Sequence, residues 1–276
     1  MRGVAGMKRK FKVFVWALAM GLVCPRIALA DPMSSVGINI QTRDSNAAAV
    51  LSDALAETYW QGASLYDYSN RLYDEIRMLR TDNGHVSMIS GEGDRNFDLE
   101  KVGQAILTKQ GQLPRHEDGA MAVELLGQGI DSTNGLPYTD VFFYLDMSFF
   151  YATYTQRMYY LRVPDGRIII YFEEVQSDFV GPDVWEEYQQ KIRTVSEAVD
   201  RRWPPFDSVV PVDDIFGMFI VSAGETRSVR VTFVTKLAFG DDASWVARWG
   251  SELPLIIRMG LQSGFNACVA IASQDP

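Results

Sequence analysis

Between about residue 110 and residue 240 the sequence alternates apolar and polar residues in short runs separated by turn signals. Alternation with a period of two is typical of half-buried strands, and strands joined by short turns pair antiparallel. The turn signals are Ser132-Thr133-Asn134-Gly135, Pro164-Asp165-Gly166 and Gly224-Glu225-Thr226-Arg227. The strands predicted around them cover 121–130, 141–163, 167–175, 215–222 and 228–239. This pattern predicts an antiparallel meander, in which 141–163 forms two strands or one strand bent at a bulge.

Helical spacing of apolar residues brackets and interrupts these strands. Helices are predicted at about 44–55, 64–80, 97–109 and 183–202. A short strand is predicted at 85–90, and a last helix follows Asp242 or Ser244, with a kink or restart at Pro254. The chain therefore reads as α+β, with extra helices before the sheet.

The first thirty residues predict export. Basic residues between Arg2 and Lys12 precede an apolar run from Val13 to Val23, and Ala28-Leu29-Ala30 matches the pattern that signal peptidase cleaves. The run is shorter than the ~20 residues of a bilayer span. Cys24 follows a weak lipobox, so we expect a soluble periplasmic protein that begins at Asp31 rather than a lipoprotein.

Charge and cysteine content restrict the partners. The first thirty residues contain six Lys or Arg and no acid, so their removal changes the formal net charge from -9 to -15. Such acidity argues against nucleic acid and anionic membrane surfaces as electrostatic partners. Cys268 is the only cysteine after residue 30, which excludes an intramolecular disulfide in the mature chain.

The hairpin around Asp165-Gly166 suggests a polar pair on an apolar face. A two-residue type I′ turn places Arg157, Tyr159 and Leu161 on the same face as Ile170, Phe172 and Glu174, with Arg157 opposite Glu174. A three-residue loop would pair Arg157 with Glu173 instead. In either register an arginine meets a glutamate, as a structural bridge or as the polar anchor of a ligand cavity.

The last predicted helix supplies a cover for this face. Ile257, Leu261 and Phe265 share its apolar side, and Phe233 lies on the apolar face of the last strand. The sequence thus predicts a cavity between sheet and C-terminal helix. Its expected lining is Arg157, Tyr159, Leu161, Ile170, Phe172, Glu174, Phe233, Ile257, Leu261 and Phe265.

Four segments carry a family resemblance. They are Thr155–Tyr160 followed by Asp165–Ile170, then Gly217–Ile220, then Gly240–Trp249 before Leu253-Pro254. Together with the element order, they resemble the StAR-related lipid-transfer (START) domains and the wider helix-grip superfamily, which includes polyketide cyclases. The resemblance covers about 97–276 and implies a curved antiparallel sheet wrapped on a long C-terminal helix, with a hydrophobic tunnel for a lipid.

Two features depart from the family pattern. Met158 stands where the family has an aspartate, and the helix at 183–202 is longer than the usual connection. That helix is either a lid or a segment packed on the helices predicted between 44 and 80. We expect three parts in the chain: a signal peptide at 1–30, an N-terminal helical segment at 31–96 and the helix-grip domain at 97–276.

Catalytic signatures are scarce. The sequence has no G-x-S-x-G, H-E-x-x-H, Walker A or G-x-G-x-x-G motif. The histidines, His85 and His116, stand beside loop residues, and Cys268 lies on an apolar helix face. Glu173 and Glu174 point to opposite faces of a strand and cannot share a site. We therefore predict no catalytic residues, no metal site and no cofactor.

The leading hypothesis is an exported, non-enzymatic protein that binds a lipid or another apolar small molecule, for transport or sensing in the cell envelope. One alternative is a helix-grip enzyme acting on a hydrophobic substrate, with Arg157, Glu174 and a tyrosine as acid-base or polarising groups. Another is an envelope scaffold with a solid core. Nucleic acid is excluded as a partner, and a transient contact with a membrane or an envelope protein is expected.

Overall fold

The computed structural model describes the strands at 64–66, 75–81 and 84–92, then residues 98–115, 120–147, 150–203, 209–224 and 229–239, and residue 270. All of them belong to the compact unit Asp31–Pro276. The predicted signal peptide, the helix predicted at 44–55 and the C-terminal helix with Ile257, Leu261 and Phe265 lie outside the described residues.

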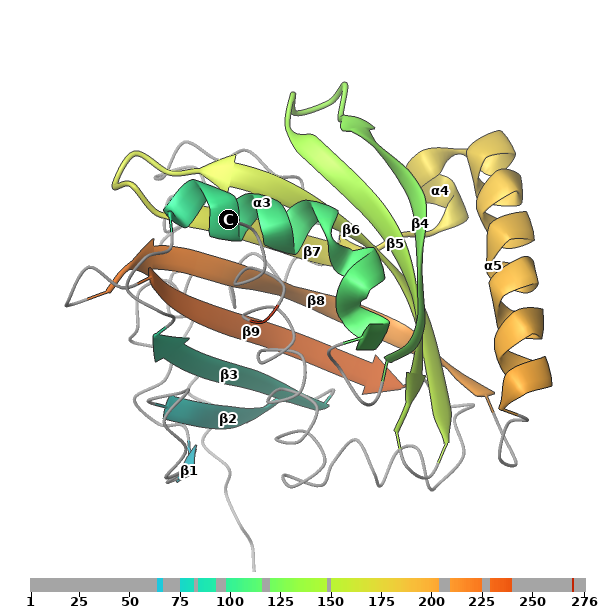
Figure 1. The fold of residues 1–276 in the computed structure, drawn as a ribbon, viewed down its shortest axis with the longest axis horizontal. Helices are drawn as coiled ribbons and strands as arrows, with labels where there is room; N and C mark the ends of the chain where they lie inside the picture. The colour runs from blue at the N-terminus through green and yellow to red at the C-terminus, as the bar shows by residue number, and fades with distance from the viewer. Residues whose placement is uncertain are drawn as a thin grey trace, which may run out of the picture. The chain divides into compact units, whose positions relative to one another are not determined.

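One sheet of nine strands organises the described chain (Figure 1). Its order is β1-β2-β3-β9-β8-β7-β6-β5-β4, so β4 to β9 form a meander and β3 pairs with β9. All neighbouring strands are antiparallel, and a short parallel pairing joins Tyr151–Thr153 of β6 to Val209–Pro211 of β8. The strands are β1 Ser64–Tyr66, β2 Glu75–Thr81, β3 Gly84–Glu92, β4 Ala120–Ile130, β5 Pro137–Asp146, β6 Tyr151–Arg162, β7 Ile168–Glu174, β8 Val209–Ala223 and β9 Val229–Phe239.

Helices cover both faces of the sheet (Figure 1). Before β4 come α3, Leu99–Thr108, and the 3-10 helix η2, Gln110–Arg115. Between β7 and β8 the chain forms α4, Ser177–Val180, and the long helix α5, Pro182–Arg202. The predictions at 97–109 and 183–202 are thus confirmed, and 141–163 is two strands, β5 and β6.

The helix predicted at 64–80 is wrong, because β1 and β2 occupy that segment. Ile76 and Leu79 are three residues apart, a spacing that suits a helix, but the segment 75–81 pairs with β3 along its whole length. Thr81 pairs with Gly84, which leaves a two-residue hairpin connection in place of a helix end. These strands extend the same sheet as β4 to β9.

The two-residue register predicted for the β6–β7 hairpin is also wrong. Val163 pairs with Arg167 and Arg157 with Glu173, so the connection has three residues, Pro164 to Gly166. The Gly166 amide donates to the Val163 carbonyl, and Gly166 has a φ of 89°. A hydrogen-bonded turn that ends in a residue of positive φ fits the usual three-residue hairpin loop.

A separate apolar cluster lies on each face of the sheet. On the face that carries α3, here called the α3 face, Val102, Ala105 and Ile106 pack on a cluster that includes Phe172 and Phe219. On the opposite face, the α5 face, Tyr188 and Val199 of α5 pack on Leu126, Phe142 and Tyr144. The sheet is thus the middle layer, and β4, β5 and β6 contribute residues to both clusters.

Candidate functional site

The observed β6–β7 register divides the predicted cavity residues between the two faces. Arg157, Tyr159 and Leu161 pair with Glu173, Tyr171 and Ile169, and Arg157 is in the network covered by α5. The other described members lie on the α3 face: Ile170, Phe172, Glu174 and Phe233. The prediction of one shared face is wrong, because the one-residue longer loop turns every side chain of one strand to the other side.

Three phenylalanines form an aromatic surface on the α3 face. The Phe219 and Phe233 rings stack with centroids 4.3 Å apart, and Phe172 lies 5.9 and 6.0 Å from them. Gly217 makes this arrangement possible, because a Cβ there would lie 2.4 Å from Cζ of Phe172. Phe172 is buried, whereas Phe233 is only partly buried.

Further along β9, beyond Thr235, the α3 face carries two more large apolar side chains. Leu237 and Phe239 follow Phe233 at intervals of four and two residues, and all three pack at the margin of the buried cluster while remaining partly exposed. Partial exposure on an apolar face distinguishes this part of the sheet from the tightly packed part under α3.

Tyr160 closes the same face next to α3. Gly103 lets α3 approach closely, since a Cβ there would lie 2.9 Å from Ile168 and 3.1 Å from the Tyr160 ring. The Tyr160 hydroxyl is buried and has no hydrogen-bond partner of ordinary geometry within the described part of the chain. Burial and the neighbouring Glu100 carboxylate raise the pKa of Tyr160 to about 12, and Glu100 forms an ion pair with Arg162 at the surface.

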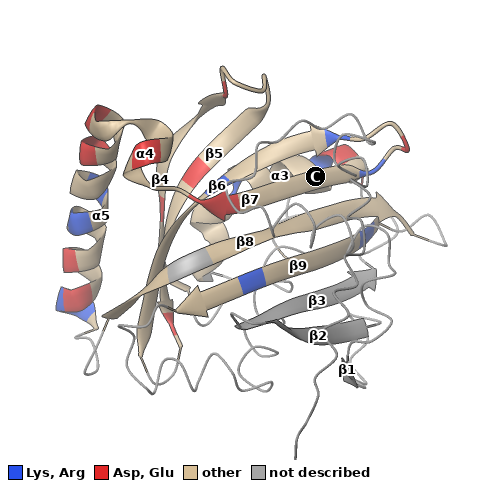
Figure 2. Cartoon of the chain, turned by 180° about the vertical axis from the view of Figure 1, so that it is seen from behind, with Lys and Arg blue, Asp and Glu red and all other residues tan. Residues whose placement is uncertain are grey.

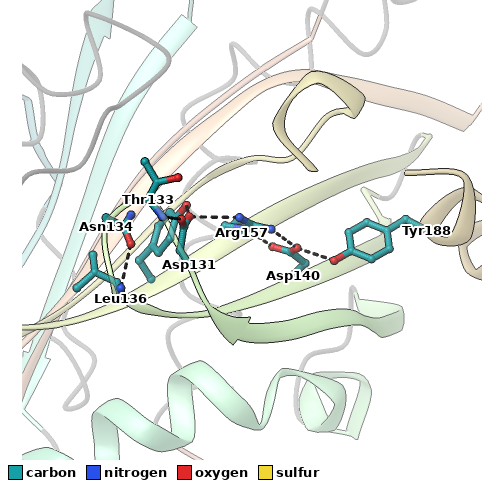
Figure 3. A network of polar contacts seen from close by, with 8 residues as sticks. Asp131, Thr133, Asn134, Leu136, Asp140, Arg157 and Tyr188 are labelled. Atoms are coloured by element: carbon teal, nitrogen blue, oxygen red, sulfur yellow. Dashed lines mark hydrogen bonds and ion pairs between the residues drawn. The ribbon is translucent and has the colours of Figure 1, made fainter. Parts of the chain in front are cut away.

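On the α5 face, Arg157 is the centre of a buried polar network (Figure 3). Its Nε and one terminal nitrogen donate to the two oxygens of Asp140, each at 2.7 Å. Its other terminal nitrogen lies 3.4 Å from Oδ2 of Asp131. Two hydroxyls complete the network: Tyr188 donates to Asp140 at 2.7 Å and Tyr159 donates to Asp131 at 2.6 Å.

Aromatic rings enclose the guanidinium. Its carbon lies 3.9 Å from the centre of the Tyr138 ring and 4.5 Å from that of Phe179 in α4. Burial acts to lower the pKa of Arg157, but the bidentate bond to Asp140 outweighs it and raises the pKa above its ordinary value. Burial acts to raise the pKa of Asp131, but hydrogen bonds from Tyr159 and Thr133 lower it overall.

The network continues as a row of charged residues across the sheet. The row consists of Asp140, Arg157 and Glu173 on β5 to β7 and Lys236 on β9, with Phe216 of β8 between Glu173 and Lys236, and all five residues are buried. The Tyr171 hydroxyl donates to Glu173 at 3.0 Å, and Lys236 Nζ lies 5.2 Å from the centre of the Phe216 ring. The signs alternate along the row, which is the arrangement that buried charges require.

Sequence reasoning identified Arg157 but not Asp131, Asp140 or Tyr188. Asp140 carried one signal, because it is a lone acid at the start of the apolar run Val141–Leu145. Tyr188 lies on the apolar side of α5, but the partner of its hydroxyl depends on how α5 lies on β5. Arg157 stands opposite Glu173, as the three-residue loop predicts, and it also forms ion pairs with Asp140 and Asp131, which the sequence did not indicate.

Three polar contacts fix α5 on the sheet. Tyr188 binds Asp140 near the start of the helix, Lys191 Nζ donates to the Leu126 carbonyl at 2.8 Å, and near the end the Tyr144 hydroxyl donates to Asp200 at 2.7 Å. The helix predicted either as a lid or as packing on helices at 44–80 therefore packs on β4 and β5 of the sheet.

Two features are absent from the described residues. Within the described ranges, no three His, Cys, Asp or Glu side chains gather in a way that could hold a metal ion. No helix in the described part of the chain is long and apolar enough to cross a membrane.

Comparison with solved structures shows the fold. The chain is similar to human StAR-related lipid transfer protein 5, with a TM-score of 0.53 and 12% identity over 88% of this chain and 98% of that one. It is similar to a STAR-related lipid transfer protein from Xanthomonas axonopodis, with a TM-score of 0.50 and 13% identity over 77% and 98%. For human STARD10 the TM-score is 0.50, with 9% identity over 83% and 81%.

By sequence, no family model and no curated protein matches the chain. The likeness therefore lies in the arrangement of strands and helices and carries no residue-by-residue assignment. The α+β architecture, the mostly antiparallel sheet and the long helix agree with the expected class. The described chain has the START-like helix-grip fold.

Proposed function

We propose that this protein binds a lipid or another apolar ligand against the α3 face of its sheet, without catalysing a reaction. The observation that carries the proposal is the aromatic surface of Phe172, Phe219 and Phe233, whose β9 side remains partly exposed. Ligand sites are mostly apolar with few polar groups, and this surface fits that description. The START-like fold supports the same choice, because similar structures are named lipid transfer proteins.

We also propose which segment covers this surface and that the protein is exported. The segment with Ile257, Leu261 and Phe265 is the proposed partner of this surface, as its apolar spacing indicates. Export to the cell envelope rests on the signal pattern that ends at Ala30. N-terminal sequencing of protein recovered from its host tests this part, and the expected first residue is Asp31.

The contacts of Arg157 favour a binding protein over an enzyme. The enzymatic alternative uses Arg157 and Glu174 as a polarising pair next to an apolar substrate. Arg157 instead binds Asp140 and Asp131 and lies on the face opposite Phe172 and Phe233. Its position on the other face from the aromatic surface supports the choice of a binding protein over that alternative.

Native mass spectrometry of protein purified from its own host, followed by lipid extraction, tests the proposal. We expect a bound apolar molecule that is retained by the wild type and by Tyr144→Phe, a change on the α5 face. Phe233→Ala is expected to reduce the bound fraction, because it removes a partly exposed ring from the proposed contact surface. A clean ligand-free mass for the wild type, in protein extracted without detergent, contradicts the proposal.

A further inference from the structure

The end of α5 and the beginning of β8 lie side by side at one end of the sheet, as the two opposite views agree (Figures 1 and 2). We call Arg201, Arg202, Trp203 and Val209 the α5–β8 end. Trp203 is 41% exposed and Val209 39%, while most large apolar side chains of the described residues are buried. A tryptophan and a valine exposed at the same end form an apolar feature that packing within the described chain does not use.

Positive charge accompanies this apolar feature. Arg201 and Arg202 are both exposed, and the Arg202 guanidinium carbon lies 4.7 Å from the centre of the Trp203 ring. Three of the five acids of α5, Asp183, Glu186 and Glu187, lie in its first two turns, and the exposed Glu197 lies one turn before Arg201. Asp200 accepts the Tyr144 hydroxyl, so this carboxylate is engaged with the sheet.

Helix stability alone explains only part of the arrangement. Cations near a helix C-terminus interact favourably with its dipole, and Arg201 Nε donates to the Glu197 carbonyl at 3.0 Å. This accounts for the arginines but not for an exposed tryptophan next to them. Tryptophan combines an apolar ring with a polar N–H and is enriched where a protein meets the interface of a bilayer.

From these features we propose that the α5–β8 end docks on an anionic lipid surface, with Trp203 and Val209 at the interface and Arg201 and Arg202 at lipid phosphates. Arginine next to an anionic bilayer increases partitioning about fivefold per residue. Because three polar contacts fix α5 on the sheet, the side chains are presented by a rigid element and little order has to be gained on docking. The proposal goes beyond ligand binding and does not depend on it.

The acidity of the whole chain makes the test selective. The formal net charge is -9 for the full chain and -15 for a chain that begins at Asp31, so a uniform charge effect would repel the protein from anionic vesicles. Vesicle flotation is measured with phosphatidylcholine alone and with a 3:1 mixture of phosphatidylcholine and phosphatidylglycerol, using protein purified from its host with a sequenced N-terminus. We expect flotation with the mixture and much less with phosphatidylcholine alone.

Single substitutions test whether the residues of the α5–β8 end contact the lipid. Arg201→Gln and Arg202→Gln are each expected to lower partitioning about fivefold, and Trp203→Ala to lower it further than either. Two matched controls lie on the same helix: Arg193→Gln removes one exposed charge, and Val184→Ala truncates a side chain that is 41% exposed like Trp203. Both controls are expected to keep wild-type partitioning, and thermal unfolding confirms that each variant folds.

Brominated lipid chains give a second readout. They are expected to quench part of the tryptophan fluorescence of the wild type but not the corresponding part of Trp203→Phe. If the wild type does not bind the anionic mixture, the proposal is wrong. The same result is expected if the α5–β8 end binds a protein and not a lipid surface. Equal losses in Arg193→Gln and Arg202→Gln overturn it as well, because the attraction would then be diffuse. Neither result bears on whether an apolar ligand is retained in native mass spectra.

Discussion

Tyr188 of α5 donates its hydroxyl to the same Asp140 oxygen, Oδ2, that receives a terminal nitrogen of Arg157. The carboxylate therefore joins three segments that are distant in sequence: β5, β6 and the insertion between β7 and β8. The ring of Phe179 in α4 lies 4.5 Å from the guanidinium carbon of Arg157. Both helices of the insertion therefore contact the ion pair of Asp140 and Arg157. The insertion is anchored through a buried charge, which ties its position to the integrity of the pair.

Removal of Asp140 tests this anchor. Asp140→Ala leaves Arg157 buried without its bidentate partner, and we expect the free energy of unfolding to fall by about 3 to 5 kcal/mol. Replacement of both residues, Asp140→Leu with Arg157→Met, is expected to recover much of the loss. Urea unfolding followed by circular dichroism measures both values.

The control for Asp140 is an exposed ion pair. Asp165 and Arg167 form a surface pair in the β6–β7 loop, so Asp165→Ala is expected to change stability by less than about 1 kcal/mol. A loss for Asp140→Ala no larger than that of Asp165→Ala contradicts the burial of the network.

Tyr160 leads to a different prediction, because its buried hydroxyl lacks a hydrogen-bond partner of ordinary geometry among the described residues. Tyr160→Phe removes an unsatisfied polar group without opening a cavity, so we expect stability at neutral pH to stay unchanged or to rise by about 1 kcal/mol. Tyr159→Phe is the matched contrast, since its hydroxyl binds Asp131, and it is expected to destabilise the protein by about 1.5 to 3 kcal/mol.

The pKa of Tyr160 adds a dependence on alkaline pH. A tyrosine whose pKa is raised from 10 to about 12 by folding contributes stability that is fully present below pH 10 and is lost as the pH rises towards 12. Unfolding free energies measured between pH 8 and pH 11 are expected to fall less steeply in Tyr160→Phe than in the wild type. Parallel curves for the two proteins refute the assignment to Tyr160.

The close contact at Gly217 predicts a severe effect of a small change. A Cβ at this position would lie 2.2 Å from the Val234 carbonyl oxygen, which is backbone, and 2.4 Å from the Phe172 ring. Gly217→Ala is therefore expected to cost about 3 kcal/mol or more, at the upper end of overpacking effects. Gly111→Ala is the control, since nothing lies within 4 Å of its Cβ position, and thermal unfolding compares the two.

The sequence was sufficient to predict most strands of the sheet, but not to predict which residues of neighbouring strands share a face. Strand positions followed from alternation, and the helices at 97–109 and 183–202 from apolar spacing. The β6–β7 register depended on whether Pro164 belongs to the loop, and one residue of difference moved Arg157, Tyr159 and Leu161 to the other face. Three-residue spacing in Ile76 and Leu79 suited a helix, although pairing with β3 makes that segment a strand.

The network around Arg157 was beyond sequence reasoning for a physical reason. Asp131 and Tyr188 are 57 positions apart, and they enter one network because Tyr159 and Arg157 of β6 reach Asp131 while α5 brings Tyr188 to Asp140. Periodicity places each of them on a side of its own element. It contains no information on which elements meet.

Phe172 and Phe233 provide the prediction that links stability to ligand binding. Phe172 is 2% exposed within the α3-face cluster, and Phe172→Ala is expected to cost about 3 to 5 kcal/mol. Phe233 stacks on Phe219 but is partly exposed, so Phe233→Ala removes less buried area and is expected to cost less than Phe172→Ala. If the partly exposed ring contacts a ligand, Phe233→Ala also lowers the retention of an apolar fluorescent probe, whereas Tyr144→Phe leaves it unchanged. Equal stability losses with unchanged probe retention would mean that Phe233 is an ordinary core residue and that any ligand contacts another surface.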